Sequence, residues 1–128
     1  MKRDLELIRN ILLAIENVEP DDRHAININS FLHLNNNPYV ISHHIKLLLD
    51  SNFIEAEGPI YTFDIDDYYI DRITSSGYDY LDSVRSPEIW AATKKKLLTV
   101  GGSATLDIVK SVATDFVKDF LTGRLPIQ

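Results

Sequence analysis

The fold of this chain is decided by residues 35–55, which read NNNPYVISHHIKLLLDSNFIE. Asn37 and Pro38 form a helix-start signal, because an Asn side chain can accept from a first-turn amide and Pro has no amide hydrogen to leave unpaired. The apolar residues that follow recur at helical spacing, which predicts a helix from Pro38 to about Ser51. Asn52 suits the end of this helix, since Asn tolerates the left-handed conformation. We expect Ser42 to lie on the face of this helix that is nearer to solvent.

On either side of this helix the sequence predicts an α+β fold that is mostly helical. An amphipathic helix is expected over residues 3–17 and a short strand at Ile26 and Ile28, while residues 30–34 fit either a longer strand or one helical turn. After the central helix we expect three short antiparallel strands, with Gly58-Pro59 as the first turn. These strands cover residues 53–57, 60–65 and 68–73.

Three more helices are expected towards the C-terminus. Thr74-Ser75-Ser76 can cap a helix that ends near Arg85, with Tyr78, Leu81 and Val84 inward, and Ser86-Pro87-Glu88 begins another that runs through Leu98. Gly101-Gly102 breaks the chain, and Ser103 or Thr105 caps a last helix that ends at Thr122. We expect one domain over residues 1–128, with a core of residues 1–85 and a helical extension of residues 86–128.

The order helix, strand, helix, hairpin resembles the plan of a winged-helix domain. Residues 38–55 are similar to the recognition helix and first wing strand of bacterial winged-helix regulators. This resemblance implies that the helix from Pro38 enters the major groove of double-stranded DNA. The side chains then expected to reach bases or phosphates are Asn36, Asn37, Tyr39, Ser42, His43 and Lys46.

Across nearly the whole chain the sequence resembles the domain-of-unknown-function family 2513 of bacteria and their phages. The residues that carry this resemblance are 1–9, 11–16, 44–48, 72–82, Trp90, 94–96 and 101–103. Asn52 is a departure, because such proteins usually have Gly at this position. The resemblance implies a winged-helix-like fold and a phage or prophage protein, and it leaves the function open.

The charge of the chain is concentrated in one region. The formal net charge is −6, with a pI near 5.0. Residues 1–51 carry −2, residues 52–85 carry −6 and residues 86–128 carry +2. DNA would be repelled by so acidic a wing, so contact has to come from the helix or from a dimer that turns the wings outward. The alternative is a protein-interaction module in which Asp64, Asp66 and Asp67 meet a basic partner.

Other functional classes have little support in the sequence. The chain has no Cys, and it contains no phosphate-binding loop or nucleophile elbow, so we expect no enzyme activity, cofactor or metal site. His43 and His44 are adjacent and point about 100° apart on a helix, which does not suit zinc. No signal peptide or membrane span is expected, which favours the cytoplasm.

The last helix has a broad apolar face that has to be covered. A homodimer through residues 105–122 is one way to cover it, and intramolecular packing is the other. The residues expected at such a dimer contact are Val109, Val112, Phe116 and Phe120.

Overall fold

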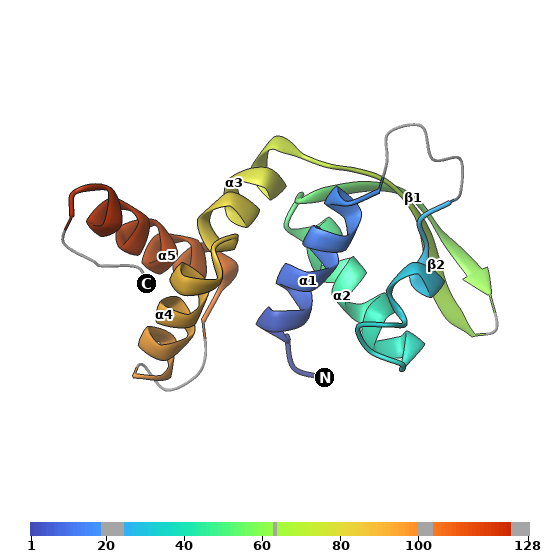
Figure 1. Cartoon of the computed structure of the whole chain (residues 1–128). Coiled ribbons are helices and arrows are strands. Elements are labelled where there is room, and N and C mark those ends of the chain that lie inside the picture. Colours follow the sequence, from blue (N-terminus) through green and yellow to red (C-terminus); the bar gives the residue numbers. More distant parts are fainter. Residues whose placement is uncertain (19–24, 63, 100–103, 124–128) are drawn as a thin grey trace. The chain divides into compact units, whose positions relative to one another are not determined.

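Five α-helices, one 3-10 helix and one antiparallel pair of strands make up the computed structural model, which describes residues 1–18, 25–62, 64–99 and 104–123 (Figure 1). The elements are α1 (Leu5–Glu16), η1 (Ile28–Phe31), α2 (Pro38–Asp50), β1 (Ile54–Thr62), β2 (Ile65–Ile73), α3 (Ser75–Val84), α4 (Pro87–Leu98) and α5 (Leu106–Leu121). The prediction of a mostly helical α+β chain is confirmed.

The chain divides into two compact units, which are residues Met1–Tyr78 and Asp79–Gln128. The division falls within α3, earlier than the border expected after residue 85. That the two units act together as one domain stays a prediction.

The first unit is built on two helices whose ends follow the sequence signals. The Asp4 side chain caps α1 by accepting from the N–H of Leu7 at 3.1 Å. The Asn37 side chain caps α2 by accepting from the N–H of Tyr39 at 3.0 Å, and Pro38 is the first helical residue, as predicted. Asn52 has φ 59, so it takes the left-handed conformation expected of it. Both α1 and α2 pack against β2.

The region after α2 is one long hairpin, and the prediction of three short strands is wrong. Gly58-Pro59 lies inside β1, where the register shifts between Glu57 and Ile60, and pairing then continues to Thr62 opposite Ile65. Gly58 has φ 127, which only glycine adopts readily, so the chain bulges there without reversing. The strand therefore continues through a dipeptide that was expected to turn.

The expected strand at Ile26 and Ile28 is reduced to a single bridge. The N–H of Ile70 donates to the carbonyl of Ile26 at 2.9 Å, and Ile28 already begins η1. A capping box between Asn27 and Ser30 closes the start of η1. Of the two alternatives for residues 30–34, the helical turn is the one found.

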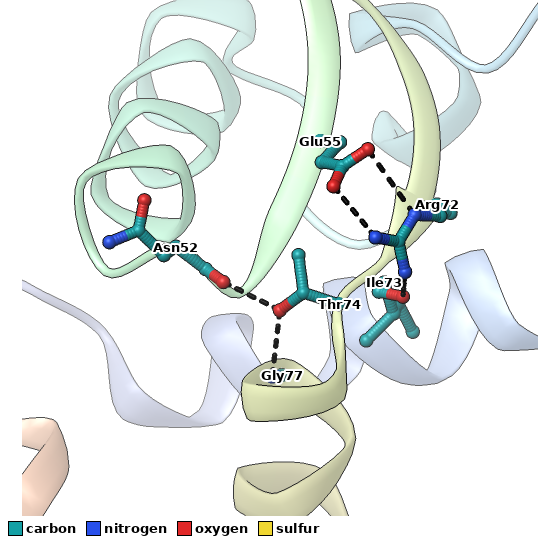
Figure 2. Close-up of polar contacts among 6 residues, drawn as sticks. All are labelled: Asn52, Glu55, Arg72, Ile73, Thr74 and Gly77. Carbon is teal, nitrogen blue, oxygen red and sulfur yellow. Dashed lines mark hydrogen bonds and ion pairs between the residues drawn. The ribbon is translucent and has the colours of Figure 1, made fainter.

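A polar joint links the end of α2 to the start of α3 (Figure 2). The Thr74 hydroxyl donates to the carbonyl of Asn52 and accepts from the N–H of Gly77 at 3.0 Å. Beside it, the Arg72 guanidinium makes a two-bonded ion pair with Glu55 across the hairpin. Gly77 is buried, and a Cβ there would overlap the carbonyl of Phe53. The joint thus depends on a glycine that the sequence does not single out.

The second unit has the helix boundaries that its caps predict. Ser86 accepts from the N–H of Ile89, and α4 runs from Pro87 to Leu98 as expected. Thr105 caps α5 in the same way, whereas Ser103 and the Gly101-Gly102 break lie outside the described residues. The helices α4 and α5 pack together over a core that includes Ile89, Trp90, Leu97, Val109 and Ala113.

The prediction for α3 is partly wrong. Leu81 and Val84 are buried as expected, but Tyr78 is exposed and Tyr80 is fully buried in its place. The buried stripe follows the spacing of Gly77, Tyr80, Leu81 and Val84, which is the i, i+3, i+4, i+7 pattern of one helix face. Tyr78 lies off this stripe.

Candidate nucleic-acid interface

Three of the predicted DNA-contacting side chains lie along one face of α2. Tyr39, His43 and Lys46 are spaced by four and three residues, so they stand one above the other on the helix. Tyr39 is 53% exposed, and His43 and Lys46 are partly exposed. Asn36 is exposed immediately before the helix. These four residues, which we call the α2 face, are the ones the structure brings together.

Two other predicted residues have structural roles. Asn37 is exposed, but its side-chain oxygen is already used as the cap of α2. Ser42 is buried, and its hydroxyl donates to the backbone carbonyl of Asp66 at 2.7 Å. The expectation that Ser42 faces solvent is wrong, because β2 packs over that side of α2.

The N-terminal residues lie beside α2, which the sequence does not indicate. The backbone N–H of Asp4 donates to Nε2 of His44 at 2.8 Å, and Nδ1 of the same ring bonds the carbonyl of Val40 at 2.8 Å. Because one ring nitrogen accepts and the other donates, His44 is held as the neutral Nδ1–H tautomer. The ring is buried. It fixes the start of the chain against the helix that carries the α2 face.

Positive charge gathers around His43. Its pKa is lowered first by burial and then by His44, the N-terminal ammonium, Lys46 and Arg3. The ammonium, lysine and arginine are cations that disfavour a further charge on the imidazole. The α2 face is therefore neutral at His43 and is bordered by the basic residues at the start of the chain, where Lys2 is also exposed.

The acidic residues of the hairpin have partners within the first unit. Asp66 pairs with Lys46 at 2.7 Å and raises the pKa of that lysine by their hydrogen bond. The Asp67 carboxylate accepts from the N–H groups of Ile28 and Tyr68, at 3.0 and 2.8 Å. Asp64 accepts from the hydroxyl of Tyr61 at 2.9 Å. The three residues expected to bind a basic protein thus hold the hairpin to itself, to η1 and to α2.

The residues expected at a dimer contact do not form one surface. Val109 is fully buried in the second unit, so it is not available to a partner. Val112 and Phe116 are partly exposed, and Phe120 is 45% exposed. Dimerisation through the remaining three residues stays a prediction.

Metal binding and membrane insertion find no support in the described part of the chain. Across residues 1–18, 25–62, 64–99 and 104–123, no group of three or more His, Asp or Glu side chains is placed to hold a metal ion. Within the same residues, no helix is both long enough and apolar enough to cross a membrane. The chemistry on offer at the α2 face is hydrogen bonding and positive charge.

Comparison with known sequences identifies the family. Residues 2–104 match the family described as "Hypothetical protein (DUF2513)". The chain belongs to the DUF2513 family. The match extends from the basic N-terminal residues through α4 and so includes the whole α2 face.

One relative supports this assignment. The DUF2513 chain is 30% identical over 122 residues to a protein of Haemophilus influenzae (strain ATCC 51907 / DSM 11121 / KW20 / Rd), named as an uncharacterized protein. The similarity covers 94% of this chain and 99% of that relative. No solved structure matches the chain.

Proposed function

We propose that this DUF2513 protein binds double-stranded DNA through the α2 face and the basic residues at its N-terminus. The observation that carries the proposal is the position of those basic residues. The bond between Asp4 and His44 holds the start of the chain against α2, so its cations border exposed polar side chains of a helix. Cations beside hydrogen-bonding side chains suit a phosphate backbone and the adjoining base edges.

The arrangement of the first unit supports the same proposal. The chain runs from α1 through the Ile26 bridge, η1 and α2 into a hairpin, and Ile26 pairs with β2 of that hairpin. This is the element order of a winged-helix domain, in which the helix before the hairpin reads the major groove. In this comparison, α2 is the recognition helix and β1 with β2 is the wing.

The hairpin limits how DNA can be held. Glu57 and Asp71 are exposed on it, and Asp66 neutralises Lys46. A wing of this charge does not suit phosphate, because most non-specific affinity comes from cations that release counterions. The proposed grip therefore uses α2 and the N-terminus, and we expect it to be weak and strongly dependent on salt.

The test is a fluorescence anisotropy titration of the full chain against a labelled random duplex at low salt. We expect binding in the range of about 1–100 µM. Replacing Lys2 and Arg3 with Gln should weaken it and reduce the slope of log K against log salt by about 1 for each phosphate that is no longer neutralised. Lys118→Gln is the matched control, because it removes a cation from α5, in the second unit.

Two outcomes of this titration would overturn the proposal. One is the absence of binding by the wild-type chain at about 100 µM protein in low salt, where the non-specific contribution is already measurable. The other is a decrease in affinity for Lys118→Gln as large as that for the N-terminal variant, because binding would then follow total charge.

Asp66 provides a second arm of the test. Asp66→Asn removes the negative partner of Lys46, so we expect tighter binding to DNA. Asp71→Asn makes the same change of charge at an exposed position of the same strand. If both variants tighten binding equally, Lys46 has no particular part in it and the α2 face is not the contact.

The proposed role is one of binding and involves no catalysis. As a regulator of phage or prophage type, which the family resemblance implies, the protein would act in the bacterial cytoplasm. The alternative of an acidic hairpin that binds a basic protein stays a prediction, and the internal partners of Asp64, Asp66 and Asp67 weigh against it.

A further inference from the structure

The helix α5 carries two rows of apolar side chains, and only one of them is buried. Val109 and Ala113 belong to the buried row, on the helix that packs with α4. The second row, which we call the apolar row, is Ile108, Val112, Phe116 and Phe120, each four residues after the last. Ile108 is 47% exposed and Phe120 is 45% exposed. The apolar row therefore extends along nearly the whole helix with its two ends open to solvent.

Acidic residues border the apolar row on one side. Asp107, Asp115 and Asp119 each precede a member of the apolar row by one residue, and Ser111 completes the same line. Successive residues are turned by about 100°, so this acidic row lies on the side away from Val109 and Ala113. Asp107 and Asp115 are exposed. The open surface of α5 is thus apolar with one negative border.

A pocket lies at the Phe120 end of the apolar row. It has a volume of about 430 Å³, and its apolar lining comes from Pro87, Ile89, Val117, Phe120 and Leu121. Such a volume falls in the range of pockets that hold a bulky apolar group. A helix lying along the apolar row could insert one large side chain here.

We propose that the exposed face of α5 docks an amphipathic helix from another protein, in which an apolar stripe is bordered by Lys or Arg. The apolar row supplies the buried contact, as in other helix-in-groove complexes. The acidic row selects the partner, because opposite charges along the border favour docking and like charges oppose it.

The same charges disfavour a second copy of this chain. In an antiparallel pair of α5 helices related by a two-fold axis, each border meets its own equivalent. The acidic row of one copy would then lie against the acidic row of the other, and like charges at that spacing repel. A basic helix meets no such penalty.

The experiment measures binding of two model peptides to the full chain by fluorescence anisotropy. Both peptides are helical and carry the same Leu and Ile stripe, and the borders are Lys in one and Glu in the other. We expect the Lys peptide to bind at least about tenfold more tightly. The double variant Asp115→Lys, Asp119→Lys should reverse this preference. Asp64→Lys, Asp71→Lys is the matched control, because it makes the same change of charge on the hairpin.

Each remaining outcome counts against the proposal. Equal binding of the two peptides, binding of neither, or a preference that the hairpin variant reverses equally well would overturn it. A dimer in light scattering that Phe120→Asp dissociates would show that a second copy covers the apolar row instead. Circular dichroism of every variant confirms that the helices are intact, so that a decrease in binding can be assigned to the surface.

Discussion

The imidazole of His44 accepts a hydrogen bond from the backbone N–H of Asp4, forty positions earlier in the chain, at 2.8 Å. The same ring bonds the carbonyl of Val40, so one buried side chain ties the residue before α1 to the first turns of α2. This contact places the N-terminal cations beside the α2 face, and the proposed function depends on it.

Replacing His44 with Ala should therefore destabilise the first unit. The change leaves the Asp4 N–H without its acceptor and opens a cavity, and we expect the unfolding free energy to fall by about 2–4 kcal/mol. Urea unfolding followed by circular dichroism measures this. His43→Ala is the control, since that ring is partly exposed and its removal should cost less than about 1 kcal/mol. Equal decreases for the two variants would contradict the role given to His44.

The titration of His43 tests the charges around the α2 face. Its pKa is lowered in the folded chain, so between that lowered value and about 6.5 the unfolded chain binds more protons. The contribution of His43 to stability is thus present above pH 6.5 and falls as the pH drops through this window. An NMR titration of the ring should show the low pKa, and Lys46→Gln should raise it partway. Lys118→Gln should leave it unchanged; a shift there would mean that distant charge controls His43.

Asp67 should matter more than its position in an acidic hairpin indicates. Its carboxylate satisfies the N–H groups of Ile28 and Tyr68, so Asp67→Ala should cost about 1–3 kcal/mol of unfolding free energy. Asp67→Asn keeps an acceptor oxygen and should cost less. Asp64→Ala, which removes only an exposed bond to Tyr61, is the control. If Asp67→Ala costs no more than that control, the carboxylate does not hold η1.

Gly77 is the position where a single methyl group should do most damage. An added Cβ would overlap the Phe53 carbonyl and press on Ile73, so Gly77→Ala should destabilise by about 1–3 kcal/mol despite the better helix propensity of Ala. Ser76→Ala, at the exposed neighbouring position, should be neutral or slightly stabilising. Thermal unfolding of the two variants makes the comparison, and equal melting temperatures would contradict the close contact.

Local signals in the sequence predicted the helices well. Asn37-Pro38 and Ser86-Pro87 marked the starts of α2 and α4 because a cap and a proline act within one turn. Gly58-Pro59 misled, because the same dipeptide that turns a chain can also form a bulge when pairing continues beyond it. Turn chemistry alone does not distinguish the two.

The candidate site was predictable only in part. The spacing of Tyr39, His43 and Lys46 placed them on one face, but the burial of Ser42 depends on β2, which lies more than twenty residues later. The contact between Asp4 and His44 has no local pattern at all. Long-range hydrogen bonds of this kind are set by the packing of whole elements, which the spacing of residues in a sequence does not reveal.

The bond from Ile28 to Asp67 also has a consequence for the order of folding. Part of the start of η1 is held by a residue thirty-nine positions later, so the short helix cannot be completed before β2 has joined the unit. Contacts between residues far apart in the chain form late, because a long loop must first be closed. On the ribosome, residues 25–37 should therefore stay accessible to proteases until the hairpin has been synthesised, well after α1 is able to form.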